Sequence, residues 1–211
     1  MIAHKTPSLV QRLFPKLLWK EQANSQRLYL TFDDGPVPEA TPMVLDHLKK
    51  YQAKATFFCV GDNIRKHPHL FSQVVAGGHS VGNHTHNHLD GWKCSTSQYV
   101  DNIRLCQELI LQHSGQALSH KPLFRPPYGR LNFNQIKAIL PDYRIVMWDV
   151  LSGDFSLALK WEKCLRKSIQ HTKGGSIVLF HDSNKTLKKL DLVLPSFLEH
   201  FSERGYTFDC L

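Results

Sequence analysis

Short apolar runs recur along this chain from about residue 27 to its end. They are bounded by polar or turn-forming residues, a pattern typical of strands that are buried on both faces of a parallel sheet. The predicted strands are Leu28–Phe32, Ala55–Val60, Ser80–Gly82, Leu123–Arg125, Arg144–Trp148, Ile177–His181 and Thr207–Cys210.

Helical patterns of apolar positions lie between these runs. The clearest is Ser97–His113, in which Val100 and Ile103 begin an apolar face at helical spacing. Gly115 follows as the expected end of this helix. Further helices are predicted from Thr41–Pro42 onward and at about Pro68–Ala76, Asn134–Leu140, Leu157–Gln170 and Leu190–Phe201.

The alternation of strands and helices predicts an α/β fold. A mainly parallel sheet of about seven strands would be covered by helices, either as an open sheet or closed as a barrel. The length of 211 residues suits one such domain. We expect it to cover residues 27–211, after an N-terminal arm over residues 1–26.

The charge of the chain changes this picture little. Lys and Arg number 26 and Asp and Glu 18, which gives a net charge of +8. The basic residues do not cluster beyond short pairs inside helical patterns, and a solvated helix face explains such pairs. No nucleic-acid-binding motif accompanies them, so we expect no nucleic-acid partner. No pattern indicates an oligomeric state.

Cysteine usage and the N-terminus bear on the compartment. The five cysteines include no CxxC pair, and free thiols in a reducing compartment are the simplest interpretation. Arg12, Pro15 and Lys16 interrupt any apolar core of a signal peptide. No stretch approaches the ~20 apolar residues of a membrane span. A cytoplasmic location is therefore expected by default.

Candidate chemistry gathers where the predicted strands end, the edge at which parallel α/β folds place their sites. In TFDDGP the first strand ends in Asp33 and Asp34. Adjacent residues of an extended segment point to opposite sides, so one carboxylate could bind a metal while the other accepts a proton. Taken alone, the motif could equally be a strand exit built from turn residues.

The segment GNHTHNH adds two histidines four positions apart. His84 and His88 could converge on one ion if the backbone turns helically, and neutral imidazole is a common zinc ligand. A lone pair of this kind is usually structural, but the Asp-Asp strand end supplies a third ligand. His86 lies between them and is expected to point elsewhere.

Two further motifs complete the set. In RPPYG, neither proline has an N–H, so the first free backbone donor after Arg125 belongs to Tyr128, on a stiff loop that suits an oxyanion donor. Arg125 could pair with a site carboxylate, although the loop could also serve only as a rigid turn. His181 ends the strand IVLFH and is a candidate proton donor to a leaving group.

Together these motifs resemble one family. TFDDGP, ATFFCVG, GHSVGNHTHNH, FRPPYG, WDVLSGDF and SIVLFHD occur in the order and with the spacing of the polysaccharide deacetylase family, the NodB-homology domain of carbohydrate esterase family 4. The similarity covers about residues 27–210. It implies a distorted (β/α)7 barrel, similar to a TIM barrel, and a deacetylase catalytic domain over residues 27–211.

The resemblance also implies roles for individual residues. Asp34, His84 and His88 would bind a divalent metal, most simply Zn²⁺, while Co²⁺, Ni²⁺ and Mn²⁺ also suit this donor set. Asp33 would be the general base and His181 the general acid. The supporting residues it implies are Arg125 to orient Asp33, Asp154 to tune His181, the Tyr128 N–H for the oxyanion, Leu179 for the acetyl pocket, and Thr85 to brace the histidine loop.

The implied reaction is hydrolysis of the N-acetyl group of an N-acetylglucosamine-containing saccharide, of the chitin or peptidoglycan type. The sequence departs from the family at Phe155, where tryptophan is common, and at Leu151, where aspartate is frequent. Phe155 would therefore line the sugar site without an indole N–H. Two alternatives stay open: an amidohydrolase acting on a non-sugar amide, and a non-catalytic glycan-binding relative.

Overall fold

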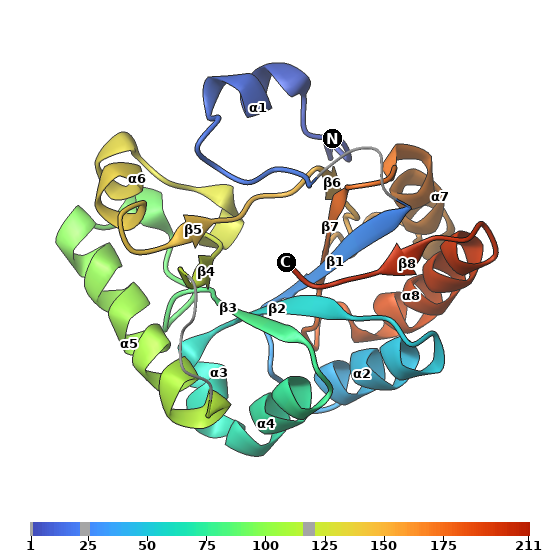
Figure 1. Ribbon diagram of the computed structural model, residues 1–211, viewed down its shortest axis with the longest axis horizontal. Coiled ribbons are helices and arrows are strands. Elements are labelled where there is room, and N and C mark those ends of the chain that lie inside the picture. Colours follow the sequence, from blue (N-terminus) through green and yellow to red (C-terminus); the bar gives the residue numbers. More distant parts are fainter. Residues whose placement is uncertain (1, 22–25, 116–120) are drawn as a thin grey trace.

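A computed structural model describes residues 2–21, 26–115 and 121–211. Its centre is a curled sheet whose paired strands all run parallel, with helices packed around the outside (Figure 1). The strands are β1 (Arg27–Asp33), β2 (Ala55–Cys59), β3 (Ser80–Asn83), β4 (Leu123–Phe124), β5 (Arg144–Ile145), β6 (Val150–Leu151), β7 (Ile177–His181) and β8 (Thr207–Phe208).

The strand order is β5-β4-β3-β2-β1-β7-β6, with β8 added beside β1. β5 and β6 are thus the two ends of the path and do not pair with each other, which makes the barrel incomplete. The predicted α/β fold and its distorted barrel are confirmed. The helices are α1 (Ser8–Leu13), α2 (Ala40–Lys50), α3 (Gly61–Lys66), α4 (Pro68–Ala76), α5 (Thr96–Ser114), α6 (Phe133–Ile139), α7 (Trp161–His171) and α8 (Leu187–Ser202), with single 3₁₀ turns at Gly91–Lys93 and Pro127–Gly129.

The core fixes the central strands. Phe32 stacks between Phe57 and Phe180, its neighbours on β2 and β7, at ring-centroid distances of 5.1 and 5.9 Å. Each of these rings is at most 1% exposed, and burying such a side chain stabilises the fold by about 1.5–3 kcal/mol. The residues that follow Phe32 therefore leave a rigid part of the sheet.

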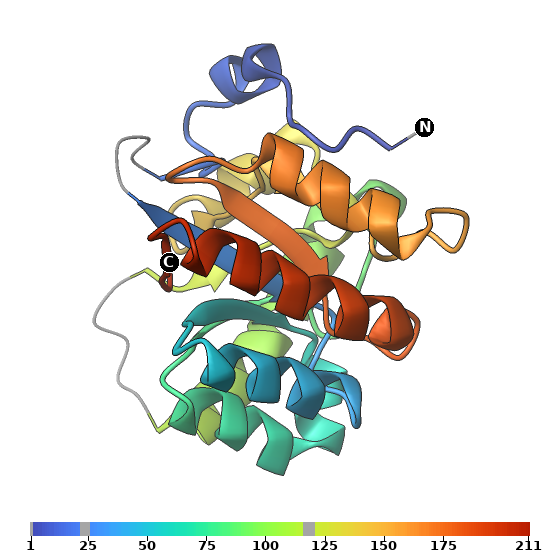
Figure 2. The same ribbon diagram turned by 90° about the vertical axis from the view of Figure 1, so that its right-hand side faces the viewer.

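The arm crosses the gap between β5 and β6. It passes along one end of the sheet in Figures 1 and 2 and makes isolated bridges to the barrel at Lys5, Leu18 and Lys20. We use the term arm for residues 2–20. The predicted boundary at residue 26 falls beside residues 22–25, which lie outside the described part of the chain.

The differences from the predicted elements are local. The predicted strand Arg144–Trp148 keeps only its first two residues as β5, because the Met147 N–H donates to Leu18 of the arm instead of to a strand. The helix predicted from Leu157 begins at Trp161, and Leu157 is exposed. Helices α1 and α3 and strand β6 were not predicted, because all three are short and carry no periodic pattern.

The cysteines and the helix lengths bear on the expected compartment. All five cysteines are free thiols, as their spacing suggested. Among the described residues, no helix is long and apolar enough to cross a bilayer.

Candidate metal centre and catalytic site

The turn after β1 carries both candidate aspartates, and a buried carboxyl holds it in place. Asp182 accepts hydrogen bonds from the Gly35 N–H at 3.1 Å and from the Thr41 hydroxyl at 2.6 Å. A Cβ at Gly35 would lie 2.0 Å from an Asp182 oxygen, so only glycine fits there. Burial raises the pKa of Asp182 to about 8 against the lowering effect of these donors. No pattern in the sequence indicated this support.

Asp34, His84 and His88 form a group whose donor atoms all lie within 4.8 Å of one another. The Asp34 Oδ1 atom is 3.8 Å from His84 Nε2 and 3.2 Å from His88 Nε2. Two atoms that bind a tetrahedral zinc ion at about 2.1 Å are themselves about 3.4 Å apart. The three side chains predicted as metal ligands therefore have the spacing that one ion requires.

The other ring nitrogens orient these imidazoles. His84 Nδ1 donates to the Arg125 carbonyl oxygen at 2.8 Å, so its Nε2 carries the lone pair. His88 Nδ1 contacts the Tyr128 hydroxyl at 3.2 Å. Burial lowers the pKa of His84, with Asp33 opposing it, and this favours the neutral ring that a metal needs.

One atom in the group accepts no well-aligned hydrogen bond from the described residues. Asp34 Oδ1 is buried, and its nearest polar neighbour is His88 Nε2 at 3.2 Å; such an oxygen costs about 1–3 kcal/mol unless another group satisfies it. Burial would raise the pKa of Asp34, but His88 and His181 hold it below its ordinary range, so the oxygen is anionic. A divalent cation fits this unmet demand.

Asp33 lies between the metal group and a buried arginine, with its Oδ2 atom 3.7 Å from His84 Nε2. Arg125 has no exposed surface, and its Nη1 donates to Asp33 Oδ1 at 2.8 Å and to the Thr31 hydroxyl at 2.7 Å. Its Nη2 and Nε donate to the carbonyl oxygens of Met147, at 2.8 Å, and Val146, at 3.3 Å. The guanidinium is thus held on all sides and fixes the Asp33 carboxylate.

His181 lies opposite Asp33, because the parallel register of β1 and β7 pairs these two residues. Its Nδ1 is 2.9 Å from Asp154 Oδ1. The other carboxylate oxygen, Asp154 Oδ2, accepts a hydrogen bond from the backbone N–H of His181 at 2.8 Å. Burial lowers the pKa of His181, but Asp154 outweighs it and the net pKa rises to about 9. The Phe155 ring stands edge-on to the His181 ring at a centroid distance of 5.3 Å.

These side chains open onto one cavity of about 490 Å³. Leu179, which is 2% exposed, lies in its wall. Tyr128 has a positive φ of 59°, and its ring is exposed beside His88. The cavity is lined by Asp33, Asp34, His84, His88, Tyr128, Arg130, Trp148, Leu151, Phe155, Leu179, His181, Ser183 and Lys185.

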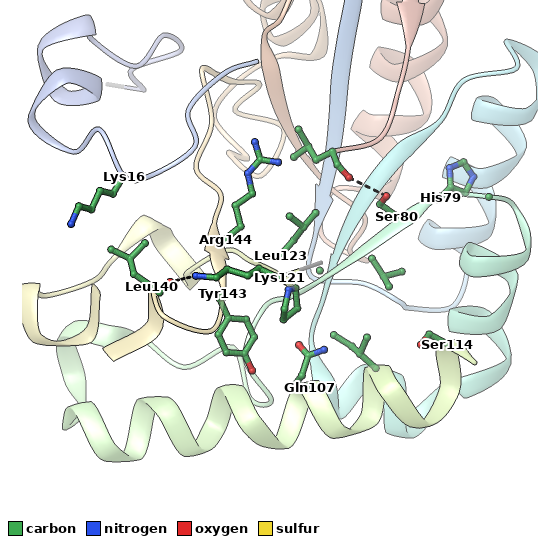
Figure 3. A pocket seen from close by; sticks show the side chains of 16 residues that line it. Lys16, His79, Ser80, Gln107, Ser114, Lys121, Leu123, Leu140, Tyr143 and Arg144 are labelled. Atoms are coloured by element: carbon green, nitrogen blue, oxygen red, sulfur yellow. Dashed lines mark hydrogen bonds between the residues drawn. The ribbon is translucent and has the colours of Figure 1, made fainter. Parts of the chain in front are cut away.

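A larger cavity, of about 860 Å³, lies at the opposite end of the strands (Figure 3). Ser80, Leu123 and Arg144, which begin β3, β4 and β5, belong to its lining. None of the candidate catalytic or metal-binding residues reaches it. Size alone therefore does not locate the catalytic site.

The comparison with protein families agrees with this geometry. A family model described as polysaccharide deacetylase matches residues 20–141, more than half of the chain. The chain belongs to the polysaccharide deacetylase family. The family model therefore does not cover residues 1–19, which include most of the arm.

Members of the polysaccharide deacetylase family are similar along nearly the whole chain. A peptidoglycan-N-acetylglucosamine deacetylase of Bacillus cereus is 33% identical over 192 residues, which is 90% of this chain and 88% of that protein. A chitooligosaccharide deacetylase of Azorhizobium caulinodans is 31% identical over 160 residues, 75% of each. A solved peptidoglycan N-acetylglucosamine deacetylase superposes with a TM-score of 0.88 at 30% identity, covering 98% of this chain and 95% of that one.

Three further residues of the deacetylase motifs, Thr85, His86 and Asp149, make contacts outside the metal group. The Thr85 hydroxyl accepts the Leu89 N–H at 2.9 Å within the histidine loop. His86 is not in the metal group of the described residues, and its Nδ1 lies against Gly61. Asp149 directly precedes β6, and its carboxylate contacts Lys5 of the arm and Ser176.

Sequence reasoning gave no role to Arg130. Its guanidinium stands over the rings of Trp92 and Tyr128, at 5.0 and 5.4 Å from their centroids, and Nη1 donates to Asp90 at 2.6 Å. Arg130 directly follows the RPPYG motif, and that position was the only signal available.

Proposed function

We propose that this protein is a divalent-metal-dependent deacetylase, with zinc as the favoured ion, that hydrolyses the N-acetyl group of an N-acetylglucosamine-containing saccharide. The observation that carries the proposal is the buried Asp34 Oδ1, which accepts no well-aligned hydrogen bond from the described residues and lies 3.2 and 3.8 Å from the Nε2 atoms of His88 and His84. The same site contains the Asp33 carboxylate, paired with Arg125, and the His181 imidazole, paired with Asp154. A metal site with a separate base and acid is what amide hydrolysis requires.

Asp34, His84 and His88 would hold the ion, which supplies Lewis acidity that activates water and polarises a carbonyl oxygen. Asp33 would take the proton of the attacking water, and Arg125 keeps its carboxylate aimed at the cavity. The Tyr128 N–H would donate to the oxygen of the tetrahedral intermediate.

His181 would complete the reaction by protonating the departing nitrogen. This step is needed because an amide anion is a very poor leaving group. The hydrogen bond of Nδ1 to Asp154 leaves Nε2 to carry the transferred proton, and Leu179 would contact the acetyl methyl group. The products are acetate and a free amino sugar.

The saccharide assignment draws on the relatives, whose names place peptidoglycan and chitooligosaccharides among their substrates. Acetate release from chito-oligosaccharides, peptidoglycan fragments and cyclic amides would be compared. We expect turnover of a saccharide. Turnover of the cyclic amides alone would overturn the proposal, and binding of saccharides without acetate release would indicate a glycan-binding protein.

Removing the metal should stop the reaction. We expect dialysis against a chelator to lower acetate release by at least about 10³-fold, because metal activation of water supplies several kcal/mol. Adding back one equivalent of Zn²⁺ should restore it, and Co²⁺, Ni²⁺ and Mn²⁺ are the comparison ions. Full turnover by chelator-treated protein with no measurable metal would refute metal dependence.

If His181 is the general acid, the rate of acetate release should fall on the alkaline side of its pH profile. The pKa of His181 is raised to about 9, so the protonated form needed for catalysis is lost as pH rises through that value. A bound dication opposes protonation, and acetate release should therefore fall at or somewhat below pH 9. Asp154→Asn should move this limb down by about 1–3 pH units. An unchanged alkaline limb in the rate profile of this variant would argue against the role.

A further inference from the structure

Residues 2–19 of the arm lie outside both the family model and the motifs, yet the arm contacts the segment that orients Arg125. We propose that the arm is a positioning element of the catalytic site, acting through residues 145–151. The catalytic part of this inference rests on the proposed function, because it assumes that Arg125 holds the base. Lys5 and Thr6 are the positioning residues.

Arg125 donates two of its side-chain hydrogen bonds to this segment. Its Nη2 and Nε donate to the carbonyl oxygens of Met147 and Val146, and only Nη1 is left for Asp33 and Thr31. A buried guanidinium whose acceptors move loses hydrogen bonds that water cannot replace. The position of these two carbonyl groups therefore determines the direction in which Arg125 points.

None of the described strands holds these carbonyl groups from the outer side. β5 and β6 are the ends of the sheet, and the arm takes the place of a strand between them. The Leu18 N–H donates to the Ile145 oxygen at 2.9 Å, and the Leu18 oxygen accepts from the Met147 N–H at 2.7 Å. The arm thus holds the residues on either side of Val146.

The beginning of the arm fixes the other end of the segment. Lys5 Nζ pairs with Asp149 at 2.5 Å, and this carboxylate is only 4% exposed. The Thr6 backbone N–H donates to the backbone carbonyl oxygen of Asp149 at 2.9 Å, and the Thr6 hydroxyl donates to the backbone carbonyl oxygen of Trp148 at 2.8 Å. A buried carboxylate with a specific cation gives the arm a defined register on the barrel.

The arm also reaches the wall of the site. A cavity of about 480 Å³ lies between the arm, at Pro7 and Val10, and the side chains of Tyr128, Trp148 and Phe155. These three aromatic side chains also line the catalytic cavity. These three side chains therefore separate the arm from the catalytic cavity.

The test compares Lys5→Met, Thr6→Val and the conservative Lys5→Arg with two controls in the full-length, zinc-loaded protein. Arg12→Gln changes an exposed residue of α1 on the same arm. Val193→Ala, in α8, lowers stability from within the core, away from the arm. All are assayed at a temperature at which each variant is folded.

We expect Lys5→Met and Thr6→Val each to lower kcat by about 10- to 100-fold, because small misplacements of catalytic groups have effects of this size. KM should change by less than about twofold and zinc content should stay constant. Lys5→Arg should recover most of the rate, and both controls should keep it. Arm variants that lose stability but keep the kcat of Val193→Ala would overturn the proposal.

A second readout does not depend on turnover. Hydrogen exchange of the Arg125 Nε–H, followed by ¹⁵N NMR, reports its bond to Val146 directly. It should be at least about 10-fold faster in Lys5→Met than in Arg12→Gln, since a loosened acceptor leaves the N–H open to water. If the wild-type protein releases no acetate, the proposed function fails, and the Arg125 exchange rate alone then decides whether the arm positions Arg125. Equal exchange rates would refute that.

Discussion

Replacing His88 by alanine will lower kcat/KM by at least about 10³-fold and will remove most of the bound metal, because one of three protein ligands is lost. The His88 side chain is 29% exposed, so its removal leaves no large cavity in the core. The fold should therefore survive, and the loss can be assigned to the site. Metal content of the purified variant and acetate release would be measured together.

Tyr128→Phe is the matched control for this variant. It keeps the ring beside His88 and removes only the hydroxyl that lies 3.2 Å from Nδ1. A partner of a metal-binding imidazole typically contributes 10- to 100-fold to affinity or activity, so the expected loss is smaller than for His88→Ala. A His88→Ala protein that keeps stoichiometric metal and wild-type turnover would contradict the assignment of His88.

Much of this site could be predicted from the sequence, because the strands that carry it are apolar and central. Parallel strands bring their carboxyl ends to one edge, and Asp33 and His181 are paired in the register of β1 and β7. The three predicted metal ligands also lie close together, since the loop after β3 brings His84 and His88 to the same side as Asp34.

Other features could not be predicted, because they depend on contacts between distant residues with no local pattern. Asp182 follows the predicted acid, but its role as the acceptor for Gly35 requires the turn after β1 to fold over it. In the sequence Lys5 is one of many scattered basic residues, and its partner Asp149 lies 144 positions away. Strand β6 is too short to show an apolar period.

The second large effect concerns the base. Asp33→Asn should lower kcat by about 10²- to 10⁴-fold, because an amide cannot accept the proton of the attacking water. Metal content should remain, since the metal group consists of Asp34, His84 and His88. Acetate release with metal analysis checks both, and a variant with wild-type kcat would rule out Asp33 as the base.

The same substitution has a separate consequence for stability. An asparagine oxygen still accepts from Arg125, but the buried guanidinium loses its counter-charge, so the free energy of unfolding should fall by about 1–3 kcal/mol. Adding Arg125→Met removes the unpaired cation, and the double variant should be no less stable than Asp33→Asn while remaining inactive. Denaturant unfolding of the single and double variants separates the two roles of this carboxylate. If the double variant regained activity, proton transfer at Asp33 would not be the step that the substitution blocks.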